Sequence, residues 1–146
     1  MTNEVTHRTV ETNGIRMHLA EMGTGPLVVL CHGFPELWYS WRHQLRALAE
    51  AGFRVVAPDM RGYGQTDRPE AIDQYTLFHM LGDMVGLLDA LGAEQSVIAG
   101  HDWGAVVAWH AAQLRATIML PGCGHWTQQE RAAEVNAAMI DFLRRL

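Results

Sequence analysis

One short segment carries a residue type that could act as a nucleophile. Asp102 stands at the centre of Gly100-His101-Asp102-Trp103-Gly104, between a strand-like run and a stretch that we expect to be helical to about Arg115. Glycines on both sides let a chain turn sharply from a strand into a helix and lift the central side chain above the sheet. There the helix dipole and unpaired N–H groups favour a carboxylate. For this segment alone, a plain helix N-cap at Asp102 is an equally good interpretation.

His125 is the second residue that could take part in chemistry. It lies in a glycine-containing loop over 121–126, after a strand-like run over 116–120, and α/β proteins place functional side chains at the ends of strands. This position, with glycine before it and a strand preceding the loop, favours a catalytic role over that of an ordinary loop histidine. For His32 and His101 the simpler interpretation is that their hydrogen bonds support their own loops.

A polar, glycine-rich segment over 59–69 follows another predicted strand. Segments at this edge of a sheet often carry function, but Asp59 and Arg61 are interpreted here as braces of the loop. Cys31 and Cys123 have the spacing of neither a metal site nor a disulfide framework. We therefore expect neither cysteine to be functional.

The elements that position these residues alternate between strand and helix patterns. The central strands are continuous apolar runs, which is typical of a parallel sheet covered on both faces. Asn13-Gly14 joins the first two strands and favours a tight hairpin turn. The sequence thus predicts one α/β domain over 1–146, with strands over 6–11, 15–21, 27–31, 53–57 and 95–99. Helices are predicted over 37–51, 75–91 and 127–146, and a further helix follows the turn over 100–104 and runs to about residue 115.

The helices over 37–51 and 127–146 each have a clear apolar face, and a glycine follows each of the helices over 37–51 and 75–91. Gly52 and Gly92 stand where left-handed helix caps are expected. The residues that we expect to face the core are Trp38, Trp41, Leu45 and Leu48 in the helix over 37–51, and Val135, Met139, Phe142 and Leu143 in the last helix.

Composition excludes several classes of protein. The 146 residues carry 11 Lys and Arg, all of them Arg, against 16 Asp and Glu, so the net charge is −5. Without a dense basic stripe we expect no nucleic-acid partner. The apolar runs are shorter than the roughly 20 residues that cross a bilayer, and the polar start differs from a secretory signal. We expect no membrane partner and a cytoplasmic location.

The junction near 115–116 is abnormal. A predicted helix runs directly into the strand-like residues 116–120, whereas helix-to-strand connections usually take about two to six residues. If that strand does not pair, its exposed edge favours a homodimer or a domain swap.

Four motifs in order along the chain resemble the α/β-hydrolase fold family, specifically its epoxide hydrolase branch. They are His32-Gly33-Phe34-Pro35-Glu36, Arg61-Gly62-Tyr63-Gly64-Gln65-Thr66, Gly100-His101-Asp102-Trp103-Gly104-Ala105 and Gly122-Cys123-Gly124-His125-Trp126. The resemblance implies a three-layer sandwich with a mostly parallel sheet and an N-terminal antiparallel hairpin.

The resemblance also implies a mechanism and a set of site residues. Asp102 would attack a carbon of a small apolar epoxide and form an ester, which water activated by His125 would hydrolyse to a diol. The backbone N–H groups of Phe34 and Trp103 would form the oxyanion hole. No metal or organic cofactor is implied. Motif support would come from His32, Gly33, Pro35, Gly100, His101 and Gly104.

The chain departs from the family pattern at its abnormal junction. Chains of the family are considerably longer, and the block that would fall at 115–116 holds two core strands, the cap domain, the carboxylate that orients the histidine and the cap tyrosines that protonate the epoxide oxygen. Glu130 is better interpreted as a favourable charge at a helix N-terminus than as that carboxylate. We therefore expect a shortened, cap-less hydrolase of low activity, because general acid catalysis alone is commonly worth about 10²- to 10⁴-fold.

The tyrosines of this chain, Tyr39, Tyr63 and Tyr75, all lie in core motifs, so none takes the cap role by position.

Two alternatives stay open. One is a catalytically inactive truncated remnant or a self-associating module, which the missing acid and tyrosines favour. The other is a haloalkane dehalogenase or an esterase that uses the same turn. Dehalogenases share the Asp nucleophile and the tryptophan after it, but Phe34 stands where they commonly have Asn.

Overall fold

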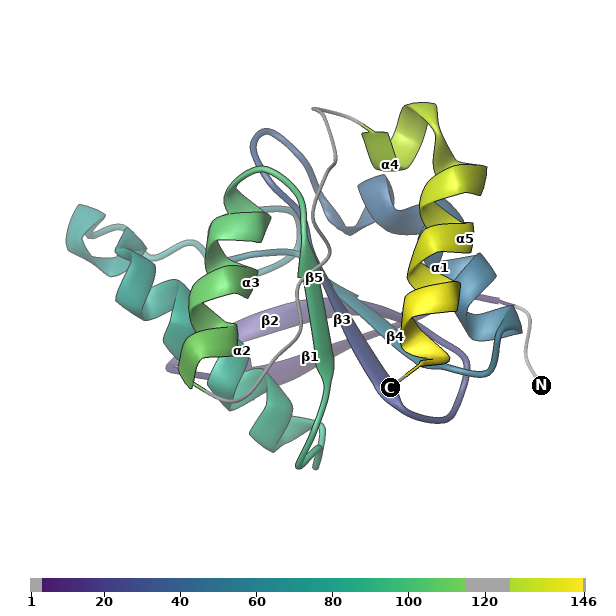
Figure 1. The fold of residues 1–146 in the computed structure, drawn as a ribbon. Coiled ribbons are helices and arrows are strands. Elements are labelled where there is room, and N and C mark those ends of the chain that lie inside the picture. Colours follow the sequence, from purple (N-terminus) through teal and green to yellow (C-terminus); the bar gives the residue numbers. More distant parts are fainter. Residues whose placement is uncertain (1–3, 115–126, 146) are drawn as a thin grey trace.

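The computed structural model describes residues 4–114 and 127–145. Its centre is a five-stranded mixed sheet with the order β1-β2-β4-β3-β5 (Figure 1). β1 pairs antiparallel with β2 and β2 with β4, whereas β3 is parallel to both β4 and β5. The strands are β1 (Thr6–Thr12), β2 (Ile15–Met22), β3 (Leu27–Cys31), β4 (Arg54–Pro58) and β5 (Val97–Gly100).

The N-terminal hairpin has the turn that its sequence predicts. Asn13 and Gly14 have φ values of 46° and 78°, and two successive positive φ angles are typical of the type I′ turn that fits the twist of a hairpin. The turn pairs Thr12 with Ile15. It also sets the register in which the odd-numbered apolar residues of β2 face one core.

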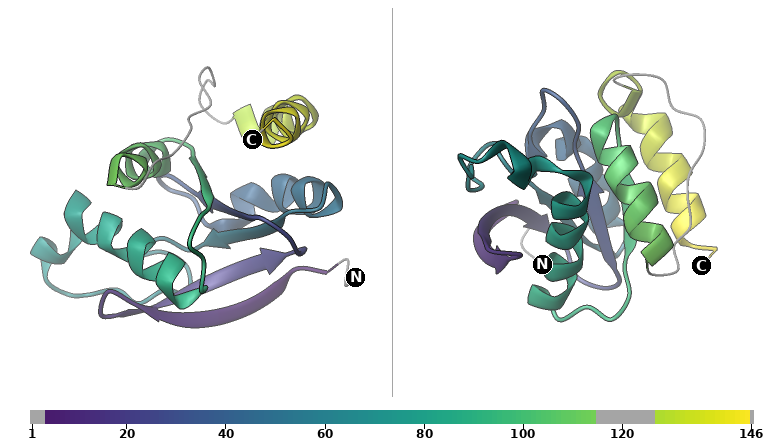
Figure 2. Two further views of the ribbon diagram at one scale, coloured as in Figure 1. Left: turned by 60° about the horizontal axis from the view of Figure 1, so that its bottom comes forward. Right: turned by 90° about the vertical axis from the view of Figure 1, so that its left-hand side faces the viewer.

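Helices cover both faces of the sheet, so the molecule has three layers (Figure 2). α2 and α3 pack on one face and α1 and α5 on the other. The described helices are η1 (Trp38–Trp41), α1 (Arg42–Glu50), η2 (Ile72–Tyr75), α2 (Leu77–Ala90), α3 (Trp103–Leu114), α4 (Thr127–Glu130) and α5 (Ala132–Leu143).

Each face of the sheet has its own apolar core. Met17, Leu87 and Val107 belong to the cluster under α2 and α3. Leu45 and Leu48 of α1 belong to the opposite cluster, together with Met139 and Leu143 of α5 and Trp41. The predicted α/β fold with an N-terminal antiparallel hairpin is therefore confirmed for the described residues, where the sheet is mixed rather than mostly parallel, because two of its four pairings are antiparallel.

Two of the predicted helices are divided in the structure, and a third begins later than predicted. The first begins as the 3₁₀ turn η1 before α1, and Trp38 is only partly buried. The helix expected from residue 75 begins at Leu77, because Thr76 is its N-cap and accepts a hydrogen bond from the His79 N–H. Gly52 and Gly92 follow α1 and α2 with φ values of 95° and 65°, as expected of caps.

The last helix breaks at Arg131, which has φ −127° and ψ 43°. Polar contacts hold α4, where Gln44 donates a hydrogen bond to the carbonyl of Gln128. α5 instead packs an apolar face, Met139 and Leu143, against α1. α4 is thus held by polar contacts and α5 by apolar packing, and the helix is interrupted between them at Arg131.

The predicted strand over 116–120, the loop over 121–126 and the junction at 115–116 lie outside the described residues.

Candidate active site

The turn between β5 and α3 has the conformation that the glycine-flanked motif predicts. Asp102 has a φ of 54°, in the left-handed region that side chains other than glycine rarely adopt. Its carbonyl accepts a hydrogen bond from the Ala105 N–H at 3.0 Å, so it starts the first turn of α3. The residue therefore stands between the carboxyl end of β5 and the N-terminus of a twelve-residue helix.

Close approach of the backbone explains two of the motif glycines. A Cβ on Gly104 would lie 2.1 Å from the Cys31 carbonyl oxygen, and a Cβ on Gly33 would lie 2.5 Å from the Cβ of Asp102. Real Cβ atoms do not come so close to their neighbours, so any side chain at either position would push apart β3 and the Asp102 turn. These two glycines allow the loop after β3 to touch the turn after β5.

One predicted backbone donor contacts the Asp102 carboxylate. The Phe34 N–H donates a hydrogen bond to Asp102 Oδ1 at 3.0 Å. Trp103 is the first residue of α3, and the role of its N–H as the second donor stays a prediction. Pro35 follows Phe34 through a cis peptide bond.

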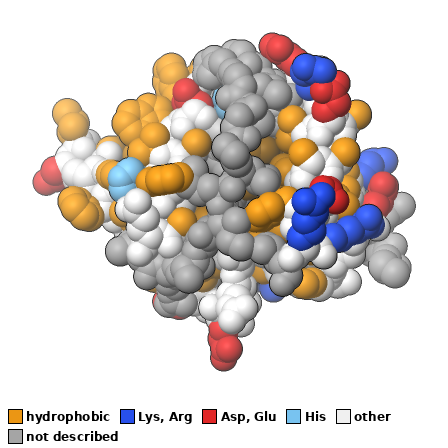
Figure 3. Space-filling view, viewed as in Figure 1, with side chains coloured by type: hydrophobic (Ala, Val, Ile, Leu, Met, Phe, Trp, Pro, Cys, Tyr) orange, Lys and Arg blue, Asp and Glu red, His pale blue; other side chains and the backbone are white. Residues whose placement is uncertain are grey.

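Two residues adjacent to this carboxylate have exposed aromatic side chains, namely Phe34, whose N–H binds it, and Trp103, the next residue in the chain. The side chains of Phe34 and Trp103 are 60% and 57% exposed. In Figure 3 apolar side chains gather at the upper left of the molecule, over the N-terminal end of α3. The candidate site therefore presents a charged oxygen beside exposed aromatic surface.

His32 uses both ring nitrogens in the loop after β3. Its Nδ1 lies 2.9 Å from the Gly33 carbonyl oxygen, and its Nε2 accepts a hydrogen bond from the Met60 N–H at 2.9 Å. These partners require the neutral tautomer with the proton on Nδ1. Burial lowers the pKa of His32, with the Gly33 carbonyl and the Asp59 and Glu36 charges acting in the opposite direction. These contacts are those of a residue that supports its loop.

Glu36 is a buried part of the site that the sequence analysis missed. It accepts hydrogen bonds from the Gly33 N–H at 3.3 Å and from Gln129 Nε2 at 2.9 Å. Its Oε2 also lies 3.3 Å from His101 Nδ1, and its Oε1 lies 3.5 Å from Gln128 Nε2. One carboxylate thus connects the loop after β3, the neighbour of Asp102 and helix α4. Acidic residues in loops are usually exposed, so the sequence alone contained no signal for this role.

Asp59 braces the loop after β4 through backbone donors. It accepts hydrogen bonds from the Trp38 N–H at 3.0 Å and from the Gln65 N–H at 3.1 Å, and it contacts His18 Nδ1 at 2.8 Å. Thr66 also donates its hydroxyl to the Asp59 carbonyl at 2.6 Å. The carboxylate therefore fixes this loop relative to both η1 and β2.

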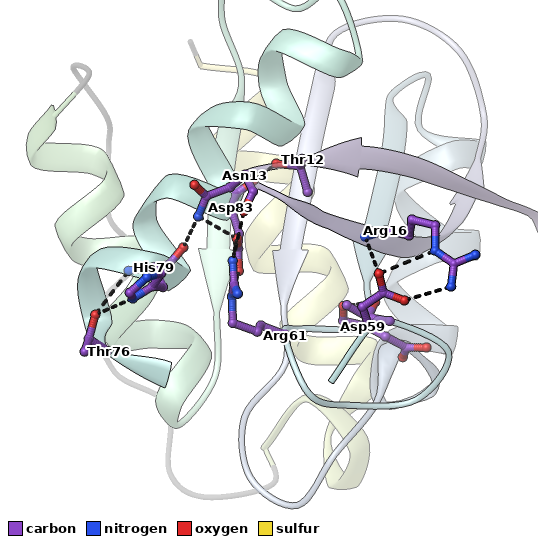
Figure 4. A network of polar contacts seen from close by, with 10 residues as sticks. Thr12, Asn13, Arg16, Asp59, Arg61, Thr76, His79 and Asp83 are labelled. Carbon is purple, nitrogen blue, oxygen red and sulfur yellow. Dashed lines mark hydrogen bonds and ion pairs between the residues drawn. The ribbon is translucent and has the colours of Figure 1, made fainter. Parts of the chain in front are cut away.

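Arg61 braces the same loop through a different carboxylate (Figure 4). Its guanidinium makes two hydrogen bonds to Asp83 of α2, at 2.6 and 2.8 Å, and a third to the Asn13 carbonyl at 3.3 Å. Both charged side chains are 1% exposed. Asn13 Nδ2 completes the group by donating to Asp83 Oδ1 at 2.9 Å. The hairpin turn, the loop after β4 and α2 are thereby joined.

The three tyrosines differ in their relation to the site. Burial, and after it the negative charge of Asp102, raise the pKa of Tyr63, whose ring contacts the His32 ring at 5.1 Å between centroids. Tyr75 donates its hydroxyl to the Pro69 carbonyl, and Tyr39 is exposed on η1.

His125, a candidate catalytic residue, and Cys123, the second cysteine, both lie outside the described residues. Cys31 is fully buried, and burial raises the pKa of its thiol to about 12.

Within residues 4–114 and 127–145 no helix is long and apolar enough to cross a membrane. In the same part of the chain no group of three or more His, Cys, Asp or Glu side chains could hold a metal ion.

Comparison with known proteins identifies relatives of this chain. It is 56% identical over 113 residues to epoxide hydrolase 3 of Siraitia grosvenorii, covering 77% of this chain and 36% of that protein. It is 58% identical over 113 residues to epoxide hydrolase A of Mycobacterium tuberculosis, covering 76% of this chain and 35% of that protein. The chain therefore spans about a third of the length of these relatives.

Solved structures agree with the sequence comparison. The crystal structure of an epoxide hydrolase from Vigna radiata superposes with a TM-score of 0.77 at 51% identity, covering 84% of this chain and 41% of that chain. Potato epoxide hydrolase I gives a TM-score of 0.74 at 48% identity, covering 77% of this chain and 36% of that chain. The alpha/beta hydrolase fold family matches residues 26–119. Because this match spans well over half of the sequence, the chain belongs to the alpha/beta hydrolase fold family.

Proposed function

We propose that this protein is a hydrolase of the epoxide hydrolase type, with Asp102 as its nucleophile. The observation that carries the proposal is the carboxylate at φ 54° between β5 and α3, with its Oδ1 held by the Phe34 N–H at 3.0 Å. Strand, strained residue and helix in this order form a nucleophile elbow. The epoxide hydrolases of Siraitia grosvenorii and Mycobacterium tuberculosis, each more than 50% identical to the chain, supply the substrate class.

In the first step Asp102 attacks a carbon of the epoxide. Because the Phe34 N–H binds Oδ1, Oδ2 is the oxygen that forms the new C–O bond. The ring C–O bond breaks, and the ring oxygen leaves as an alkoxide that takes a proton from water. The product of this step is an ester of Asp102 that carries a free hydroxyl group.

In the second step water hydrolyses this ester. His125 removes a proton from the water, whose oxygen attacks the ester carbonyl carbon, and negative charge develops on Oδ1. The Phe34 N–H already contacts this oxygen, and Trp103 supplies the second N–H. One such donor is typically worth about 3 kcal/mol of transition-state stabilisation. Collapse of the intermediate breaks the ester C–O bond, the departing diol oxygen takes the proton from His125, and the Asp102 carboxylate is restored as its acid proton passes to solvent.

The exposed aromatic surface beside Asp102 supports a small apolar epoxide as substrate. Phe34, whose N–H binds Asp102, and Trp103, which follows Asp102 in the chain, offer exposed apolar area, and apolar surface is what holds apolar substrates in general. Because more than half of each side chain faces solvent, binding should be weak and turnover slow.

Incubation with a small aryl epoxide tests the proposal. We expect the intact mass to rise by the mass of the epoxide, with the adduct mapped to Asp102, and diol to be released slowly. Asp102→Asn is the variant of choice because asparagine tolerates the left-handed conformation and keeps an oxygen for the Phe34 N–H. It should abolish both the adduct and the diol. Asp73→Asn, on an exposed turn, is the matched control and should change neither.

The outcomes separate the proposed steps from the alternatives. An adduct that accumulates without diol would place the defect at the His125 step. Diol formation that survives Asp102→Asn would contradict Asp102 as the nucleophile. Absence of both adduct and diol in the unmodified protein would favour the inactive remnant.

A further inference from the structure

A second carboxylate and two histidines form a hydrogen-bonded row away from Asp102. Asp59 Oδ2 lies 2.8 Å from His18 Nδ1, and both side chains are at most 3% exposed. On the other side of the ring, His18 Nε2 lies 3.0 Å from His7 Nδ1. The row therefore leads from a buried carboxylate through a buried imidazole to His7, which is exposed.

The partners determine where the protons lie in this row. Asp59 also accepts hydrogen bonds from the Trp38 and Gln65 N–H groups, which suit a carboxylate, so His18 Nδ1–H donates its hydrogen bond to Asp59. His18 Nε2 is then an acceptor, and His7 must supply the proton between the two rings. Gln65 Nε2 makes a longer contact, 3.5 Å, to the same His18 nitrogen. The proton of His7 is thereby placed on Nδ1, and Nε2 keeps its lone pair.

The fold holds the His7 ring in this orientation. His7 pairs with Ala20 and His18 pairs with Thr9 across β1 and β2, so the two histidines are diagonal neighbours on one face of the hairpin. The ring planes are nearly parallel, with an interplanar angle of 8° and 5.2 Å between the ring centroids. Trp38 packs against the His7 ring at 4.9 Å between centroids, with an interplanar angle of 68°. Within the described residues no hydrogen-bond partner occupies His7 Nε2.

We propose that His7 Nε2 is a second nucleophile, which accepts acyl groups from activated esters such as aryl esters. The lone pair of Nε2 attacks the ester carbonyl carbon, and the bond to the aryl oxygen breaks, releasing a phenolate. The acylated ring is then positively charged. His7 transfers its Nδ1 proton to His18 Nε2, which leaves a neutral acyl-imidazole, and the Asp59 carboxylate stabilises the resulting imidazolium of His18.

Water completes the cycle without any further group. It attacks the acyl-imidazole carbonyl, the bond between carbon and Nε2 breaks, and the acid leaves. The proton held by His18 returns to His7 Nδ1. A carboxylate that orients an imidazole and stabilises its positive charge is the arrangement by which triads activate their nucleophile. Here the activated group is the imidazole of His7, and Asp102 takes no part.

Acetylation by p-nitrophenyl acetate tests this proposal in the Asp102→Asn background, which removes the elbow nucleophile. At about pH 8, where ordinary imidazoles are unprotonated, we expect release of p-nitrophenolate and a transient acetyl group mapped to His7. His7→Gln should remove most of that release and the acetyl group. His43→Gln is the matched control, because His43 is an exposed histidine of α1, and it should leave the release unchanged.

Nitrogen-15 NMR of the unmodified protein tests the proton placement independently. We expect the His7 ring to carry its proton on Nδ1, the minor tautomer of a free neutral histidine. The proposal is overturned if His7 carries its proton on Nε2, or if His7→Gln and His43→Gln lower the release of phenolate equally. Because the assay lacks Asp102, its outcome is separate from that of the epoxide experiment.

Discussion

At the scale of single residues, the site is built from side chains whose burial and partners set their protonation. His32 is neutral because both of its ring nitrogens are engaged and burial disfavours its charged form. Cys31 is kept as a thiol by burial alone. Asp102 has a left-handed backbone conformation, and its carboxylate accepts a hydrogen bond from the Phe34 N–H. The pKa of His32 and the pKa of the Cys31 thiol therefore differ from those of the free side chains, and both differences can be measured.

His32 should make the stability of the protein depend on pH. Its pKa in the folded state is lowered, whereas the unfolded chain titrates near 6.5. Below about pH 6.5 the unfolded state therefore binds more protons at this residue, and the free energy of unfolding falls as the pH falls toward the folded-state pKa. Denaturant unfolding between about pH 8 and pH 5 should show a steeper loss for the unmodified protein than for His32→Gln. Equal slopes for the two proteins would contradict this prediction.

Cys31 should be inert toward thiol reagents in the folded protein. Its side chain is fully buried beside Met84, and its pKa is raised to about 12, so the reactive thiolate is scarce at neutral pH. In a Cys123→Ser background, Ellman's reagent should label Cys31 only after denaturant unfolds the chain. Rapid labelling of the native protein, at the rate of a free thiol, would show that the core under α2 opens locally.

At the scale of elements, short polar segments are held by partners that are distant in sequence. α4 is only four residues long, too short to be stable alone. Its Gln128 and Gln129 side chains contact the buried Glu36 carboxylate, and Gln44 of α1 binds the Gln128 carbonyl. Such a helix depends on its partners, which is why a single pattern over 127–146 did not reveal the break at Arg131.

Glu36→Ala should therefore release α4 from the loop after β3. Removal of the carboxylate leaves the Gln129 amide and the Gly33 N–H without their acceptor, and a buried unsatisfied donor typically costs about 1–3 kcal/mol. We expect faster amide hydrogen exchange in residues 127–130 and a lower free energy of unfolding. Glu130→Ala, which removes an exposed carboxylate of the same helix, is the control. Unchanged exchange in Glu36→Ala would show that α1, through Gln44 and Arg42, is sufficient to hold α4.

At the scale of the whole molecule, one buried ion pair joins parts that are far apart in the sequence. Arg61 and Asp83 connect the loop after β4 to α2, and their contacts with Asn13 include the hairpin turn (Figure 4). The pair lies on the face of the sheet that α2 and α3 cover. The pair therefore connects the hairpin to the helical layer formed by α2 and α3, and α3 is the helix that follows the Asp102 turn.

Asp83→Ala should be among the most destabilising single changes in this fold. It leaves the Arg61 guanidinium, which is 1% exposed, without its carboxylate, and breaking a buried pair in this way typically costs about 3–5 kcal/mol. Thermal unfolding followed by circular dichroism should show a clear fall in Tm. Asp73→Ala, at an exposed position, should leave the Tm unchanged. A small effect of Asp83→Ala would mean that water replaces the lost partner.

Much of the fold and of the candidate site follows from sequence alone. Apolar runs predicted β3, and Asn13-Gly14 predicted the hairpin, because these signals arise from neighbours along the chain. The spacing of Gly100, Asp102 and Gly104 likewise predicted the strained turn, since its geometry is set within five residues.

Tertiary structure alone decided the contacts between distant segments. The contacts of buried Glu36 with His101 and Gln129, the row from Asp59 to His7 and the pairing of Arg61 with Asp83 join residues that lie 11 to 93 positions apart. The burial and protonation of these groups depend on which elements pack together. Local sequence patterns do not predict that packing, because a charged residue in a loop has the same sequence neighbours whether the folded chain buries it or leaves it exposed to water.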